Sequence, residues 1–124
     1  TALRREVDTA LAETARAMEI HGVALQFTPE GLTQRNRSHL SLDQVQARWA
    51  AAGRSIQPKD TVKLLGDVRG MIGHLGDTSN LILDPDLDSY YLMDVSLVAL
   101  PQAQERLALL IAVVSKSTRS YSLR

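Results

Sequence analysis

The sequence predicts an all-α protein, an antiparallel helical bundle, and three observations lead to that prediction. Hydrophobic residues recur at spacings of three and four, which is the period of a helix with one buried face. Residues that end helices, mainly Pro and Gly, divide the chain into stretches of helical length. No stretch competes with these as a β-strand. With 124 residues, of which 44% are hydrophobic and 23% charged, residues 1–124 are expected to form a single helical domain.

The first predicted helix covers residues 2–25. Its apolar stripe is formed by Val7, Leu11, Thr14, Met18, His21 and Leu25. We therefore expect His21 in the core. The turn sequence Thr28-Pro29-Glu30-Gly31 is expected to end this helix. Residues 28–40 are polar and are expected to form a long connection in which His39 is solvated.

A second, short helix is predicted from a capping-box pattern. Ser41-Leu42-Asp43-Gln44 is typical of a helix start, because a Ser at the cap and a Gln three residues later satisfy free backbone N–H groups. Val45, Trp49 and Ala52 follow at helical spacing, and Gly53 is expected to end the helix.

A third helix is predicted to start at Gln57-Pro58, because Pro fits the first turn of a helix, and its stripe runs over residues 60–83. Its stripe consists of Leu65, Val68, Ile72, Leu75, Ser79 and Ile82. Gly66, Gly70 and Gly73 share another face, where each costs about 1 kcal/mol relative to Ala. Close approach of a helix or ligand would explain them, and so would tolerance on a solvent face.

The fourth predicted helix covers residues 88–117, after a break at Leu83-Asp84-Pro85-Asp86. Alternating steps of four and three residues define a heptad stripe, namely Met93, Leu97, Leu100, Gln104, Leu107, Ile111 and Val114. Further apolar residues widen this face, which suits a bundle of several helices. Pro101 predicts a kink, because it lacks a backbone donor and crowds the preceding turn.

The charge balance excludes several classes of partner. Lys plus Arg and Asp plus Glu number 14 each, so no net field favours nucleic acid or an anionic membrane surface. Cysteine is absent, which excludes disulfides and thiolate catalysis. The longest charge-free runs, residues 20–29 and 95–104, are ten residues each, so we expect no transmembrane helix within the chain.

An acidic turn is the most distinctive segment, because residues 70–105 contain no Lys or Arg. Asp84, Asp86 and Asp88 alternate as in the first half of an EF-hand loop. Ser89 and Val95, however, stand where that loop requires Gly and Glu, and this disfavours calcium. Capping of the fourth helix by Asp86 or Asp88 is the alternative interpretation.

The candidate ligand-binding residues are Tyr90, Tyr91, Asp94 and Asp88. Adjacent helical residues point about 100° apart, so one Tyr can pack while the other faces a cleft. A Tyr hydroxyl beside a carboxylate suits a polar small molecule, including a cationic one. No cofactor and no metal site are expected, since the three His residues lack metal-ligand spacing.

Residues 76–94, GDTSNLILDPDLDSYYLMD, followed by Leu100-Pro101, resemble a stretch of the extracytoplasmic helical sensor domains of bacterial transmembrane receptors. These receptors are methyl-accepting chemotaxis proteins, sensor histidine kinases and diguanylate cyclases. The likeness is looser from Ser41 onward, where Arg48-Trp49 fits a recurring Arg-Trp pair.

The resemblance implies a fragment of a longer receptor, namely a four-helix-bundle sensor domain that lacks part of its N-terminal side. It implies a periplasmic part of an inner-membrane protein, attached to the membrane through flanking segments. The domain would be a homodimer without enzymatic activity. It would bind a small molecule and signal, in chemotaxis or a related pathway, by ligand-biased helix displacement.

Two other functions remain open at the level of the sequence. The first is a soluble helical scaffold that binds another protein through its heptad faces. The second is a helical enzyme that uses the acidic turn with a divalent metal. Two flanking spans of about 20 apolar residues would favour the receptor over the scaffold, whereas metal-dependent turnover would favour the enzyme.

Overall fold

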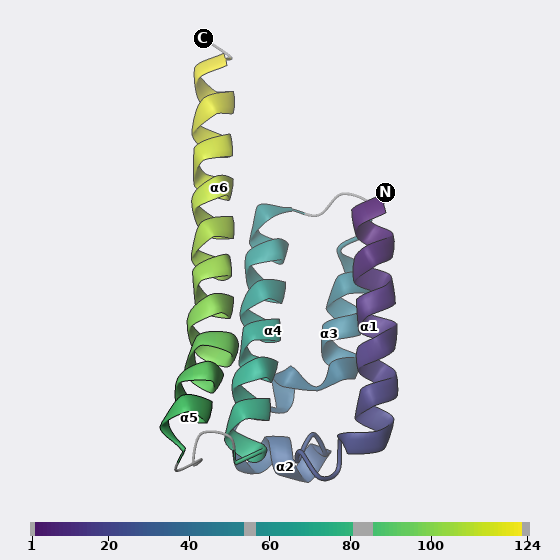
Figure 1. The fold of residues 1–124 in the computed structure, drawn as a ribbon. Helices are drawn as coiled ribbons and strands as arrows, with labels where there is room; N and C mark the ends of the chain where they lie inside the picture. The colour runs from purple at the N-terminus through teal and green to yellow at the C-terminus, as the bar shows by residue number, and fades with distance from the viewer. Residues whose placement is uncertain (1, 54–56, 81–85, 123–124) are drawn as a thin grey trace. The chain divides into compact units, whose positions relative to one another are not determined.

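The computed structural model describes residues 2–53, 57–80 and 86–122, and every regular element in these ranges is a helix. The all-α prediction is therefore confirmed. The chain divides into two compact units, Thr1–Ala51 and Ala52–Arg124, and each is described by itself. Each unit contains a pair of antiparallel helices, α1 with α3 and α4 with α6 (Figure 1).

The N-terminal unit consists of α1 (Ala2–His21), α2 (Pro29–Gln34), the 3₁₀ helix η1 (Ser38–Leu40) and α3 (Leu42–Ala51). The apolar stripe predicted on the first helix is half-buried, as at Val7, Leu11, Thr14 and Met18. Two details of that prediction are wrong. The helix ends at His21 and not near residue 25, and the His21 side chain is exposed.

The polar stretch 28–40, predicted as a connection, holds α2 and η1. The Thr28-Pro29 pair begins a helix here, because the Gly31 amide donates to Oγ1 of Thr28 at 3.1 Å and Pro occupies the first turn. Leu32 and Leu40, exposed by 1% and 3%, anchor the segment. Two buried leucines thus stabilise a stretch that is polar on average.

Helix α3 begins and ends as predicted. The Gln44 amide donates to Oγ of Ser41 at 3.4 Å, as the capping box requires. The helix ends at Ala51, and Gly53 follows with a φ of 61°, a conformation that favours glycine. His39 is exposed, as expected for a solvated residue.

Contacts from Arg48 and Trp49 join α3 to its neighbours. The Arg48 guanidinium donates to the carbonyl of His39 at 2.7 Å. Trp49 Nε1 donates to the carboxylate of Asp8 on α1 at 2.6 Å, and the Arg4 guanidinium lies 4.7 Å from the Trp49 ring centroid. The Arg-Trp pair is therefore structural in this unit.

The C-terminal unit consists of α4 (Pro58–Thr78), α5 (Leu87–Met93), the π-helical segment η3 (Asp94–Ala99) and α6 (Leu100–Ser122). An ion pair between Arg69 and Glu105 joins α4 to α6. Figure 1 shows that α6 continues past the start of α4.

Helix α4 begins at the predicted proline but ends at Thr78, earlier than residue 83. Asn80 adopts a φ of 59°, which is incompatible with a continuing helix. Ile82 and Asp84, on which the sequence-based stripe and turn partly rest, lie outside the described residues. The buried residues of α4 are Asp67, Met71, His74 and Gly76, whereas Val68 of the predicted stripe is exposed.

Two glycines of the α4 glycine face have space for a methyl group. A methyl group built at Gly66 would lie 3.7 Å from Oε1 of Glu105, an ordinary contact distance. A methyl group at Gly73 would meet no described atom within 4 Å. Neither glycine is required by close approach within the described residues, so tolerance is the interpretation that the structure favours.

The helix is irregular near Pro101, where a kink was predicted, because η3 ends two residues before it. The Leu100 amide donates to the carbonyl of Val95, five residues back, as in a π-helix. A proline ring clashes with the carbonyl four residues before it in an α-helix, which here is that of Leu97 within η3. The wider turns therefore lie where Pro101 would otherwise crowd the helix.

The π-helical segment changes which face of α6 is covered. The positions of this helix that are buried or half-buried are Met93, Asp94, Leu97, Pro101, Gln102, Glu105, Ala108, Leu109 and Ala112. After Leu97, the covered positions lie one or two residues later than the heptad stripe predicts. Leu100, Leu107, Ile111 and Val114 of that stripe are exposed. A π-helix takes about one extra residue per turn, which advances every later position by one.

Candidate functional site

The predicted ligand-binding residues lie close together along one helix. Asp88, Tyr90 and Tyr91 belong to α5, and Asp94 opens η3. The two tyrosine rings meet edge to face, with centroids 6.0 Å apart and planes inclined by 67°. Tyr90 is 39% exposed and Tyr91 58%, so neither is a core residue. The binding role of these four residues stays a prediction.

The acidic turn has a structural use. Asp86 is the N-cap of α5, and its carboxylate accepts a hydrogen bond from the Asp88 amide at 3.2 Å. This confirms the capping interpretation for Asp86. Among the described residues, no three His, Cys, Asp or Glu side chains are placed to hold a metal ion.

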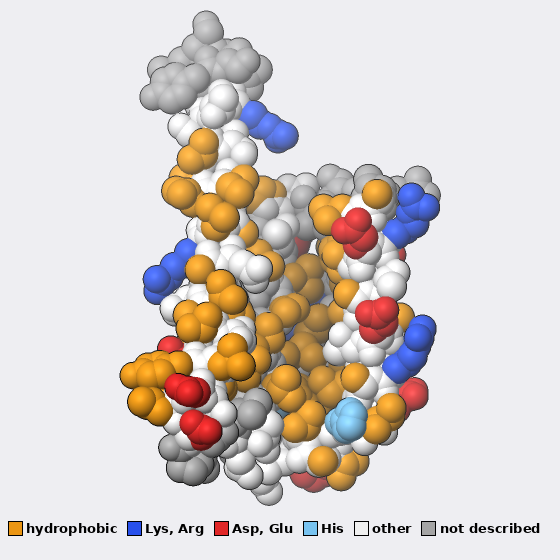
Figure 2. Space-filling view, viewed as in Figure 1, with side chains coloured by type: hydrophobic (Ala, Val, Ile, Leu, Met, Phe, Trp, Pro, Cys, Tyr) orange, Lys and Arg blue, Asp and Glu red, His pale blue; other side chains and the backbone are white. Residues whose placement is uncertain are grey.

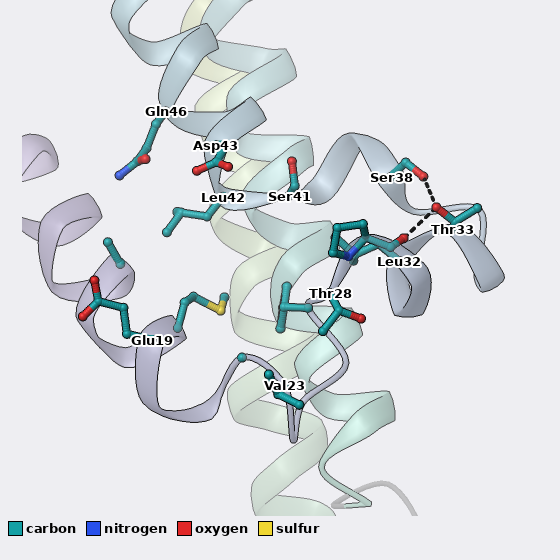
Figure 3. A pocket seen from close by; sticks show the side chains of 15 residues that line it. Glu19, Val23, Thr28, Leu32, Thr33, Ser38, Ser41, Leu42, Asp43 and Gln46 are labelled. Atoms are coloured by element: carbon teal, nitrogen blue, oxygen red, sulfur yellow. Dashed lines mark hydrogen bonds between the residues drawn. The ribbon is translucent and has the colours of Figure 1, made fainter.

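The N-terminal unit contains a cavity that was not predicted from the sequence. It has a volume of about 620 Å³, within the range typical of small-molecule sites. Helices α1, α2, η1 and α3 and the turn after α1 all contribute to it (Figure 3). Its lining residues are Ala15, Met18, Glu19, Gly22, Val23, Phe27, Thr28, Pro29, Leu32, Thr33, Ser38, Ser41, Leu42, Asp43 and Gln46.

The cavity combines apolar walls with a negatively charged rim. Figure 3 shows Glu19 from α1 on one side, and Leu42, Asp43 and Gln46 from α3 on the other. The lining contains two carboxylates and no Lys or Arg. Within the described part of the chain, no hydrogen bond or ion pair engages the side chains of Glu19, Asp43 and Gln46.

The hydroxyl groups of the cavity wall are used to hold the wall itself. Thr28 and Ser41 cap α2 and α3. Thr33 and Ser38 share a hydrogen bond of 3.1 Å, and Thr33 also donates to the carbonyl of Pro29 at 2.6 Å. Recognition is therefore left mainly to the two carboxylates and the amide, a set that suits a positively charged group on an apolar body.

This cavity depends on α2, which lies in a stretch that was predicted from the sequence as a connection. The signal that could have revealed it is the Thr28-Pro29 pair followed by Leu32, a helix start with one apolar residue on its inner face. The pairing of Glu19 with Asp43 across the cavity has no sequence signal, because the two residues are brought together only by the packing of α1 with α3.

A second surface feature is the apolar face of the helix running through α5, η3 and α6, seen along α6 in Figure 2. Its exposed large hydrophobic residues are Leu87, Tyr90, Tyr91, Leu92, Val95, Val98, Leu100, Leu107, Leu110, Ile111, Val113 and Val114. Many exposed large apolar side chains along one helix are typical of an interaction surface.

By length and composition alone, the segment Leu87–Ser120 is also apolar enough to cross a membrane, although Glu105 and Arg106 interrupt it. The sequence-based expectation of no membrane-spanning helix rested on charge-free runs, and the run in this segment, residues 95–104, is only ten residues long. A core helix would be buried within the chain, but the most apolar part of this segment is not.

Comparisons of the chain with family models, with curated proteins and with solved structures gave no match.

Proposed function

We propose that the chain is the ligand-sensing domain of a bacterial transmembrane receptor, a periplasmic domain without enzymatic activity of its own. The observation that carries this proposal is the continuous helix from Leu87 to Ser122, which packs on α4 at its start and continues past it. Such a helix suits the transmission of a displacement to whatever follows it, since packed helices move between discrete arrangements.

The ligand that best fits the N-terminal cavity is a small organic cation with an apolar body. Glu19 and Asp43 would hold an ammonium group, while Met18, Phe27 and Leu42 would contact the apolar part. The surface of Asp88, Tyr90, Tyr91 and Asp94 is the second candidate for the ligand, and the same experiment distinguishes the two.

A thermal-shift titration with alkyl and aralkyl primary amines tests the ligand class. We expect an amine to raise the Tm, and the alcohol of the same carbon skeleton to leave it unchanged. The pair Glu19→Gln and Asp43→Asn should abolish the shift. Glu30→Gln, on the exposed face of α2 outside the cavity, is the matched control and should keep it.

Two outcomes would count against the N-terminal cavity. If the shift survived the Glu19→Gln and Asp43→Asn pair but vanished with Tyr90→Phe, Tyr91→Phe and Asp94→Asn, the ligand would bind at α5. If no amine shifted the Tm, the proposed ligand class would be wrong. The receptor assignment has a separate test, because flanking sequence without two spans of about 20 apolar residues would end it.

A protein-binding scaffold is the second candidate function, and the exposed apolar face of α6 favours it. In a receptor we propose that a second copy covers this face as a homodimer, whereas in a scaffold a different protein does. Sedimentation of the purified chain separates the two, since a scaffold would remain monomeric until its partner is added.

A further inference from the structure

We propose that α6 is a one-residue register switch, in which η3 can be exchanged for α-helix while α6 rotates against α4. The proposal rests on the contacts of the C-terminal unit alone. It gives the proposed helix displacement a specific form, and it holds or fails independently of the ligand.

The first observation is that α6 carries two apolar stripes one residue apart. In the structure, the half-buried residues of α6 are Pro101, Gln102, Glu105, Ala108, Leu109 and Ala112. Without the extra residue of η3, the covered positions would be Leu100, Gln104, Leu107, Ile111 and Val114, which form the regular heptad stripe of the sequence. Either stripe presents a mainly apolar face to α4 with one polar side chain opposite Arg69, so either register can be packed.

The second observation is that different interactions favour the two registers. The observed register makes the Arg69–Glu105 ion pair and relieves the crowding by Pro101, but it leaves Leu107 and Ile111 each 58% exposed. The alternative register would bury those two side chains and replace Glu105 by Gln104 at the ion pair. Small free-energy differences of this kind are what makes an element bistable.

The exchange defines the movement that α6 would make. Conversion of the π turn to α-helix rotates the following helix by about 100° and shifts it by about 1.5 Å along its axis. The end of α6, which continues past α4, would transmit both changes to any segment attached to it.

Thiol labelling of the complete chain tests the switch, because the sequence has no cysteine of its own. Leu107→Cys and Ala108→Cys place a single thiol on the two competing faces. In the observed register the thiol at position 107 should react faster with a maleimide than the thiol at position 108.

Two further changes test whether η3 and Pro101 set the register. Pro101→Ala removes the clash that favours η3, so the ratio of the two labelling rates should invert. Deletion of Ser96 removes the extra residue itself while retaining the observed packing downstream. In that background the ratio should stay as in the parent chain, with or without Pro101→Ala.

The rates are compared at two protein concentrations, because self-association would slow labelling at position 107 in a concentration-dependent manner, and circular dichroism verifies the helicity of each variant. A ratio unchanged by Pro101→Ala in a folded chain would overturn the proposal. Should Pro101→Ala not fold, inversion of the ratio by Glu105→Gln, which removes the ion pair only, decides the question in its place.

Discussion

At the scale of single residues, two glycines illustrate opposite situations. Gly31 is buried at the start of α2, where a methyl group would lie 2.5 Å from the carbonyl oxygen of Gln26. That atom belongs to the backbone, so it cannot move aside cheaply. Gly73 lies within α4, where a methyl group would meet no described atom within 4 Å. The same residue type is thus required at one position and merely tolerated at the other.

We expect Gly31→Ala to lower the free energy of unfolding by about 1–3 kcal/mol, because the methyl group overpacks the turn before α2. Gly73→Ala is the matched change, and it should raise the free energy of unfolding by up to about 1 kcal/mol, since Ala is the better helix former. Urea denaturation measures both. A loss at position 73 would indicate that a partner occupies the glycine face.

The hydrogen bond between Trp49 and Asp8 is the second prediction at this scale. Trp49→Phe and Asp8→Ala should each cost about 0.5–1.5 kcal/mol, because each removes one hydrogen bond between α3 and α1. The double variant should cost less than the sum of the two, since the interaction is shared. Fully additive losses in urea denaturation would show that the bond contributes nothing to stability.

At the scale of elements, caps and an insertion decide where helices begin and which face they use. Thr28, Ser41 and Asp86 each accept a backbone N–H at the start of a helix. These are local signals, and the sequence contains them in recognisable form. The π-helical segment is different. It changes which face of α6 packs on α4, but the spacing of apolar residues in the sequence does not indicate it.

The N-cap of α5 gives the element-scale prediction. Asp86→Ala should lower the stability by about 1 kcal/mol, whereas Asp86→Asn should retain most of it, because Asn also caps well. The variants are compared by thermal denaturation with and without calcium. A calcium-dependent rise of the Tm that disappears in Asp86→Asn would instead favour a metal role for the acidic turn.

At the scale of the whole molecule, the apolar face of α6 is the dominant feature. Leu107 and Ile111 are each 58% exposed, and further large apolar residues lie beside them. Burying such side chains contributes about 25 cal/mol per Å² of apolar area, so a second copy can gain substantially by covering the face. The homodimer expected from the resemblance would use this surface.

We expect the chain to dimerise, and Leu107→Glu with Ile111→Glu to yield a monomer, because two charges would then be buried without partners. Leu107→Met with Ile111→Leu keeps the apolar surface and should keep the dimer. Analytical ultracentrifugation provides the masses. A wild-type chain that is monomeric at high concentration would contradict the dimer through α6.

Much of the fold follows from short-range patterns. The all-α class, the start of α4 at Pro58 and the capping of α3 by Ser41 were predicted correctly, since each depends on residues within one or two turns. The exposed position of His21 and the existence of α2 were missed. His21 is exposed because α1 ends there, four residues earlier than predicted. The helix α2 was missed because its segment is polar on average, although Leu32 is buried.

The candidate sites divide in the same way. Asp88, Tyr90, Tyr91 and Asp94 were recognisable because they are neighbours in sequence, and they remain neighbours on α5 and η3. The cavity beside Glu19 and Asp43 could not be recognised in the sequence, because these two residues belong to different helices that only packing brings together.

The sequence by itself determined that this protein is helical and where most of its helices begin, because helix caps and the spacing of apolar residues act over one or two turns. Only the tertiary structure decided which face of α6 is covered and which residues line the cavity. The reason is that the packing of α6 on α4 and the pairing of α1 with α3 both depend on contacts between segments distant in sequence.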